Sequence, residues 1–132
     1  MAACVFVSCA ETKTTIKESY ENYPNGKTKW HKEVKTIQNK HIERDAAFLR
    51  IITEFRSYYE DGTLFQTWKL VEDAGPEISC RESLYELKQY HANGKTARTY
   101  KMECDCHKEI EKTYNENGKL LTRKKAVIKR LY

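Results

Sequence analysis

Four short turn units of the same type recur along the chain, and they constrain its fold more than any other feature. Each unit has an aromatic residue, a short polar step, Asn-Gly or Asp-Gly, and then a further polar residue. The units span residues 23–27, 58–63, 90–95 and 114–119. Because they contain four of the five glycines, the glycines of this chain mark turns and little else.

Asn-Gly and Asp-Gly favour a two-residue turn in which both central residues have positive φ. Glycine takes this conformation without a Cβ penalty, and Asn and Asp tolerate it well. The turn matches the twist of two antiparallel strands, so each unit predicts a β-hairpin. The four glycines are 36, 32 and 24 residues apart, whereas a strict solenoid has a constant period. We therefore interpret the units as a degenerate repeat in an irregular meander; the alternative is four independent turns.

The composition favours one thin β domain. Of the 132 residues, 39% are hydrophobic and 33% are charged, and nine tyrosines and two tryptophans supply much of the apolar mass. This suits a sheet with one packed face and one solvated face. A helical bundle or a doubly wound fold needs longer aliphatic runs. We predict an all-β protein, an antiparallel meander of β-hairpin repeats in one extended sheet that is twisted or partly curled.

The segments between the turns predict strands and loops. Residues 46–56 are the most apolar, and their Ile, Phe and Thr content favours a long central strand over a helix. The other predicted strands are residues 28–37, 64–71, 84–90, 95–102, 107–114 and 119–132. Residues 38–45 are polar and residues 72–83 contain Gly-Pro, so both segments predict loops.

The turn units resemble the MORN-like repeats of the YwqK-type antitoxin family. Those repeats are similar in having a tyrosine, an Asn-Gly or Asp-Gly turn followed by Lys, and a further aromatic residue about six positions later. Trp68 and Tyr100 stand six positions after their glycines, whereas Trp30 stands four after Gly26 and Lys124 takes the sixth place after Gly118. The resemblance implies MORN-like β-hairpin repeats and a protein that binds a toxin in the cytosol.

The first nine residues are small and apolar, and the chain turns polar at Glu11. Val7-Ser8-Cys9 is similar to a bacterial lipobox, in which the cysteine takes the lipid. The missing basic region and the short apolar run depart from such a signal, and a start codon placed too late explains both. The alternatives are an N-terminal strand or a frayed tail. We expect residues 1–19 to be a clipped signal and tether, and residues 20–132 to be a single β-repeat domain.

Cysteines supply the only cluster that suggests site chemistry. Cys104, Cys106 and His107 stand together, and Cys80 is the only other cysteine after the N-terminal segment. In an oxidising envelope Cys80 pairs with Cys104 or Cys106; in a cytosol all three are free thiols. Two alternatives are less favoured: a zinc site gathered from Cys80, Cys104, Cys106 and a distant histidine, and a thiol or metal enzyme using Cys104, Cys106 and His107. We expect no enzyme activity, no metal and no cofactor.

The aromatic residues near the turns are the candidate binding face. These residues are Tyr23, Trp30, Tyr58, Tyr59, Trp68, Tyr90, Tyr100 and Tyr114. They either form the core of a thin sheet or present an aromatic and basic face to a protein, peptide or glycan. The net charge of +5 suits a solvated sheet face, and the basic run 123–130 is the best candidate for a weak polyanion or membrane-surface patch. No nucleic-acid module accompanies it.

Together these observations predict a non-enzymatic protein-binding module, anchored in a bacterial envelope as a lipoprotein through Cys9. A cytosolic, antitoxin-like inhibitor is the alternative. The protein partner is not identified by the sequence, no specific nucleic acid is expected, and contact with a membrane is expected only through the lipid. Pairing between sheet edges of different copies is a further expectation.

Overall fold

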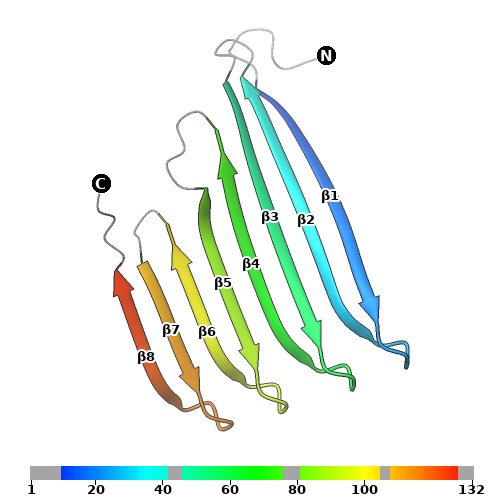
Figure 1. Cartoon of the computed structure of the whole chain (residues 1–132), viewed down its shortest axis with the longest axis vertical. Coiled ribbons are helices and arrows are strands. Elements are labelled where there is room, and N and C mark those ends of the chain that lie inside the picture. The colour runs from blue at the N-terminus through cyan, green and yellow to red at the C-terminus, as the bar shows by residue number, and fades with distance from the viewer. Residues whose placement is uncertain (1–9, 42–45, 76–80, 105–107, 128–132) are drawn as a thin grey trace.

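The computed structural model describes residues 10–41, 46–75, 81–104 and 108–127. They form eight strands in one antiparallel sheet whose spatial order follows the chain (Figure 1). The strands are β1 (Ala10–Asn22), β2 (Thr28–His41), β3 (Ala46–Tyr58), β4 (Leu64–Ala74), β5 (Glu82–Tyr90), β6 (Thr96–Glu103), β7 (Lys108–Tyr114) and β8 (Leu120–Val127). The predicted all-β antiparallel meander is confirmed, and the sheet is open, with β1 and β8 at opposite edges.

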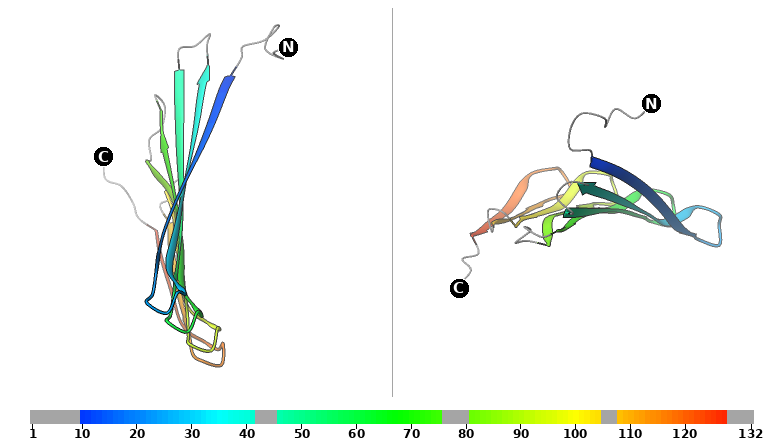
Figure 2. Two further views of the ribbon diagram at one scale, coloured as in Figure 1. Left: turned by 90° about the vertical axis from the view of Figure 1, so that its right-hand side faces the viewer. Right: turned by 90° about the horizontal axis from the view of Figure 1, so that it is seen from above.

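The sheet is a single, twisted layer. Seen from the side and from above, the eight strands follow one another without a second layer among the described residues (Figure 2). Only four described residues, Thr53, Val71, Asp73 and Cys104, are as little as 7–8% exposed, and no large side chain among them is fully buried. The sequence predicts one packed and one solvated face, but no second layer of described residues covers either face of the sheet. Cross-strand pairs and ladder hydrogen bonds take the place of a core.

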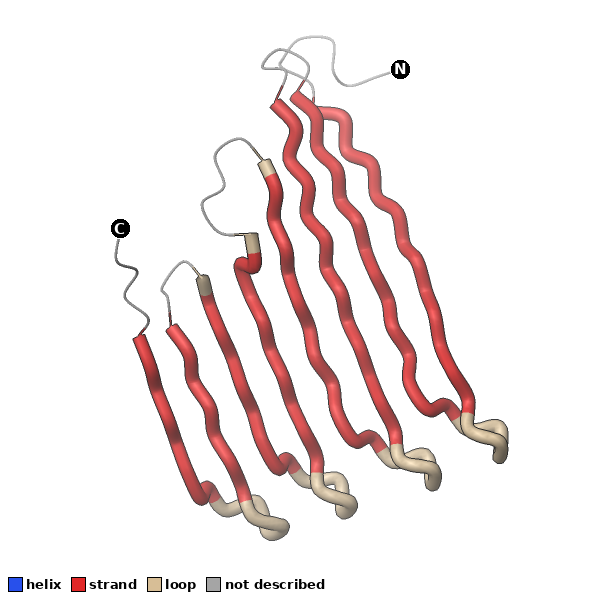
Figure 3. The backbone as a smooth tube through the Cα atoms, in the orientation of Figure 1, coloured by secondary structure: helices blue, strands red, loops and turns tan. Residues whose placement is uncertain are grey.

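Four turns of identical geometry lie at one end of the sheet, where they follow β1, β3, β5 and β7 (Figure 3). We number them turn 1 (23–27), turn 2 (59–63), turn 3 (91–95) and turn 4 (115–119). In turn 1, Gly26 N donates to Tyr23 O at 2.9 Å and Tyr23 N donates to Lys27 O at 2.8 Å, and the other turns repeat both bonds. Each is therefore a three-residue loop, a type I turn closed by a bulge at glycine.

The predicted two-residue turn is therefore wrong, although the predicted hairpins are present. Only the glycine needs the left-handed conformation, with φ between 85° and 92° in the four turns. The residue before it lies within the type I turn. In turns 1, 2 and 3 its side-chain oxygen accepts a backbone N–H two residues on, as Asn25 does from Lys27 at 2.9 Å; in turn 4 Asn115 accepts from Lys119 instead. Pro24 fits the first central position because its φ is fixed near −65°.

Strands also extend into segments predicted to be irregular. Residues 10–19 of the predicted signal and tether belong to β1, and residues 38–41 of the predicted loop belong to β2. β4 continues to Ala74 and β5 begins at Glu82, within the predicted loop 72–83. β1 lacks apolar alternation because it is an edge strand whose described side chains are exposed from Thr12 to Asn22. Its threonines still favour extended backbone.

Candidate functional site

Alternation along the strands sorts the side chains onto two different faces. Directly paired residues share a face, so the register assigns each residue. The aromatic face carries Trp30, Val34, Ile51, Phe55, Trp68, Leu70, Tyr85, Leu87, Tyr100 and Met102. The charged face carries Glu54, Arg56, Thr67, Lys69, Glu86, Lys88, Thr99, Lys101, Ile110 and Lys112.

Five rings form a continuous aromatic stripe across β2 to β6. Phe55 stacks between two tryptophans, with ring centroids 6.0 Å from Trp30 and 5.3 Å from Trp68 and with interplanar angles of 23° and 20°. The stripe continues from Trp68 to Tyr85 at 6.3 Å and from Tyr85 to Tyr100 at 5.8 Å. All five residues are half-buried. In the stacked set Trp30, Phe55 and Trp68, neighbouring rings cover each other's faces, and the exposed parts of the rings lie on the open side of a single layer.

Charged side chains border the stripe. Glu111 pairs directly with Tyr100 and Glu109 with Met102, while Lys32 pairs with Phe55 near the other end. Burial raises the pKa of Tyr100 above its ordinary value, and the neighbouring Glu109 raises it further. The Tyr100 hydroxyl therefore keeps its proton and remains a hydrogen-bond donor. The result is an apolar centre with a charged rim.

The structure divides the eight predicted aromatic residues into three groups. The aromatic stripe contains Trp30, Trp68 and Tyr100. The last strand positions before turns 2, 3 and 4 are Tyr58, Tyr90 and Tyr114. The first positions of turns 1 and 2 are Tyr23 and Tyr59. Tyr90 lies on the charged face, since Lys88 Nζ is 5.3 Å from its ring centroid. The prediction missed Phe55 and Tyr85, which complete the stripe.

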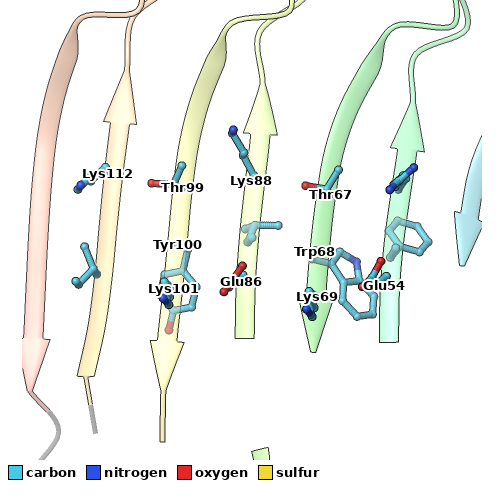
Figure 4. Close-up of a pocket in the computed structure, with 14 residues that line it drawn as sticks. Glu54, Thr67, Trp68, Lys69, Glu86, Lys88, Thr99, Tyr100, Lys101 and Lys112 are labelled. Atoms are coloured by element: carbon cyan, nitrogen blue, oxygen red, sulfur yellow. The ribbon is translucent and has the colours of Figure 1, made fainter. Parts of the chain in front are cut away.

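Two rows of side chains cross the charged face (Figure 4). The first row is Arg56, Thr67, Lys88, Thr99 and Lys112. The second row is Glu54, Lys69, Glu86, Lys101 and Ile110. A shallow groove over β3 to β7 is lined largely by these residues. Opposite charges face one another along the second row and stabilise the sheet, whereas the first row places a cation on every second strand.

Ion pairs fix part of this face. Arg50 holds Asp73 with two bonds, Nε to Oδ1 at 2.7 Å and an Nη to Oδ2 at 3.1 Å. The hydrogen bond to Asp73 raises the pKa of Arg50. Lys101 Nζ lies 3.0 Å from a carboxylate oxygen of Glu103, and this contact raises the pKa of the exposed Lys101. These groups are neutralised by their partners, so they add little net charge to this face.

Side chains of each turn bond to the backbone of the next turn, and we call this arrangement the turn ladder. Turn 1 bonds to turn 2 through Tyr23 Oη to Tyr58 O (2.7 Å), Asn25 Nδ2 to Glu60 O (2.9 Å) and Lys27 Nζ to Asp61 O (2.8 Å). Turn 3 bonds to turn 4 through His91 Nε2 to Tyr114 O (2.8 Å), Asn93 Nδ2 to Glu116 O (2.7 Å) and Lys95 Nζ to Asn117 O (3.4 Å).

The step from turn 2 to turn 3 is weaker. Its one side-chain contact is Tyr59 Oη with Tyr90 O at 3.5 Å. Asp61 stands where Asn25 and Asn93 donate, but its carboxylate has no N–H to donate and only accepts, from Thr63. Thr63 is also too short to replace Lys27 or Lys95. The ladder therefore consists of two firmly joined pairs of turns with a looser step between them.

The structure places one of the candidate site cysteines. Cys104 is buried and takes part in a disulfide bond. Cys9, Cys80, Cys106 and His107 lie outside the described residues, so its pairing with Cys80 stays a prediction. In the described ranges, no group of three or more His, Cys, Asp and Glu side chains gathers as metal ligands do. The described residues also contain no helix with the length and hydropathy of a membrane span.

Comparisons with known proteins leave the family open. None of the family models, curated proteins or solved structures compared with the chain matches it. What the structure establishes is the coarser class, an open eight-stranded antiparallel meander of β-hairpins.

Proposed function

We propose that the protein is a non-enzymatic protein-binding module whose aromatic face takes up an apolar surface of a partner protein. The observation that carries this proposal is the aromatic stripe, five half-buried rings that cross five strands of a single layer. Aromatic residues are enriched at protein interfaces because they bury a large area and lose little side-chain entropy.

The surroundings of the stripe suggest the chemistry of the partner. Glu109 and Glu111 lie beside Tyr100 at one end, and both are only half-buried. Glu111 is paired with Arg98 at 3.2 Å, and Lys32 lies at the other end of the stripe. A partner with an apolar centre and charges of both signs at its margin complements this surface, because rim charges favour opposite charges during encounter. The β-sheet presents the rings from strands, so the surface is preorganised and binding orders few side chains.

The cysteines support a location in the cell envelope. A disulfide at Cys104 supports an oxidising environment, since disulfides persist mainly outside the cytosol. Together with the lipobox-like Val7-Ser8-Cys9, it favours an envelope lipoprotein anchored through Cys9. Mass spectrometry of the N-terminus from the native host, with free-thiol counting, tests this part of the proposal. A diacylated Cys9 supports it, and an unmodified N-terminus with all thiols free overturns it.

The alternative is a cytosolic antitoxin-like inhibitor of MORN-like type. The feature that favours it is the recurring Asn-Gly-Lys hairpin, which appears in turns 1, 3 and 4. In that case the aromatic face binds a toxin instead of an envelope protein. The compartment experiment above separates the two versions, while both share the same binding face.

Site-specific crosslinking tests the binding face itself. A photo-crosslinking residue at Leu87, between Trp68 and Tyr100, lies on the aromatic face. The matched control at Thr99 lies on the charged face of the neighbouring strand. In the native host, we expect a crosslinked partner protein from position 87 and none from position 99. Crosslinks only from position 99 would contradict the proposal.

A further inference from the structure

We infer that the two edge strands are complementary, so that β8 of one copy pairs with β1 of a second copy of this chain. The inference does not depend on the proposed function. Among the described strands, β1 pairs only with β2 and β8 only with β7, which leaves one side of each free. Both edges expose large apolar side chains. Ile16, Tyr20 and Val127 are 56%, 67% and 60% exposed, whereas edge strands normally avoid such residues.

A constant register governs the pairing between successive hairpins. The residue four positions after one turn glycine pairs with the residue five positions before the next glycine. The three examples are Trp30 with Ser57, Gln66 with Gln89 and Arg98 with Thr113. Applied to the free edges, the same register pairs Thr122 with Glu21 of a second copy. It also keeps the aromatic and charged faces continuous.

The side chains that meet in this register are complementary. Val127 lies opposite Ile16 of the second copy, so two exposed apolar side chains cover each other. Lys125 lies opposite Glu18, and Arg123 lies opposite the ring of Tyr20. Opposite charges and aromatic contacts directly across strands are stabilising. Pairing of β8 with another β8 instead places the basic residues 123–125 of two copies against each other, which like-charge repulsion disfavours.

The turn ladder provides a second, independent match. Asn117 and Lys119 occupy the positions from which Asn93 and Lys95 donate to the following turn. Within the described residues, Asn117 Nδ2 and Lys119 Nζ have no hydrogen-bond partner. On β8–β1 pairing they reach the carbonyl oxygens of Pro24 and Asn25 of the second copy, the equivalents of the Glu60 and Asp61 acceptors. Pairing of like edges by a two-fold axis puts the turns at opposite ends and loses these bonds.

The contact is head-to-tail, so each added copy presents a new free edge. Such heterologous contacts build open-ended stacks unless the rotation closes a ring. The aromatic stripe repeats in every copy of the stack. The assembly therefore presents several equivalent binding faces side by side.

Sedimentation velocity of the full chain over a range of concentrations tests this inference. We expect species that grow beyond the dimer as concentration rises. Lys125→Glu or Glu18→Lys alone should weaken association about tenfold, because each places like charges opposite one another. An equimolar mixture of the two variants should assemble again. Wherever copies of the two different variants meet, positions 125 and 18 carry opposite charges. Lys88→Glu, on the charged face away from the edges, is the matched control and should leave assembly unchanged.

Three results would overturn the inference. They are a monomer at every concentration, a discrete dimer that grows no further, and a mixture of the two charge variants that fails to regain assembly. Circular dichroism of each variant confirms that the sheet is formed, so a loss of association is not mistaken for unfolding.

Discussion

The ring of Phe55 lies nearly parallel to the indole of Trp68, with centroids 5.3 Å apart and planes inclined by 20°. The two residues pair directly across β3 and β4, seven positions before and six positions after Gly62. Leu87 and Tyr100 have the same relationship around Gly94. The hairpin geometry thus fixes which positions pair, and Phe55, Trp68 and Tyr100 of the stripe occupy these positions in the second and third hairpins.

Phe55→Ala should lower the free energy of unfolding by about 2 kcal/mol, because it removes two stacked ring pairs and half-buried apolar area. Urea unfolding followed by tryptophan fluorescence measures the loss. Phe65→Ala is the matched control, since Phe65 is more exposed and contacts one ring, Tyr59, at 5.1 Å. The free energy of unfolding should fall clearly less in Phe65→Ala than in Phe55→Ala. Equal losses for the two variants would show that the stripe is not a special stabilising element.

Asp61→Asn combined with Thr63→Lys should raise the free energy of unfolding by about 1 kcal/mol, because two new donors complete the weak step of the turn ladder. The new Asn Nδ2 faces the carbonyl of Ala92, and the new Lys Nζ faces that of Asn93. The reverse exchange in turn 1, Asn25→Asp with Lys27→Thr, should destabilise by a similar amount. Thermal unfolding compares both double variants with the parent. No difference between them would contradict the ladder.

Acid should destabilise the protein partly through Asp61. Its hydrogen bonds from Thr63 lower the pKa of this carboxyl in the folded state. A group with a lowered folded pKa adds stability above its unfolded pKa, near 4, and loses that contribution as pH falls through the folded value. Asp61→Asn should therefore show a shallower loss of stability between pH 5 and pH 2. Urea unfolding at several pH values gives the pH dependence of the free energy of unfolding for the parent and for the Asp61→Asn variant. Equal pH dependences would contradict this account.

Gly94→Ala should lower the free energy of unfolding by about 1 kcal/mol, since a residue with Cβ resists the left-handed conformation. The backbone φ is 86°, and no atom lies within 4 Å of the added Cβ, so the cost is conformational and not steric. Gly94→Asn should cost less, because Asn tolerates this region. Chemical denaturation of both variants measures which one is the more stable. An alanine variant as stable as the asparagine variant would contradict it.

Much of this architecture was predictable from the turn units. Four Gly-centred hairpins, a central strand at residues 46–56 and an open meander follow from the Asn-Gly spacing and the β-prone composition. The turn type was not, because Asn-Gly fits both a two-residue turn and a type I turn with a bulge. Hydrogen bonds such as Gly26 N to Tyr23 O decide between them.

The edge strand and the stripe were harder to predict for different reasons. Residues 11–21 show no apolar alternation, since solvent reaches both faces of β1. Distance from the turns predicts Tyr58 and Tyr90 as members of the binding face and omits Phe55. Counting seven positions back and six forward from Gly62 and Gly94 gives Phe55, Trp68 and Tyr100 of the stripe, but not Trp30 or Tyr85. That signal was present in the sequence, but its use requires the bulge that fixes the register.

Both tryptophans of the chain lie in the stripe, so their fluorescence reports on the proposed binding face directly. The most direct measurement is collisional quenching of tryptophan fluorescence by acrylamide. It is made first on the free protein and then after addition of the partner protein that crosslinking at position 87 identifies. We expect Trp30 and Trp68 to be readily quenched in the free protein and strongly protected in the complex, while the matched Lys88→Ala variant behaves in the same way. Equal quenching with and without the partner would contradict the account, because the aromatic face would then remain uncovered.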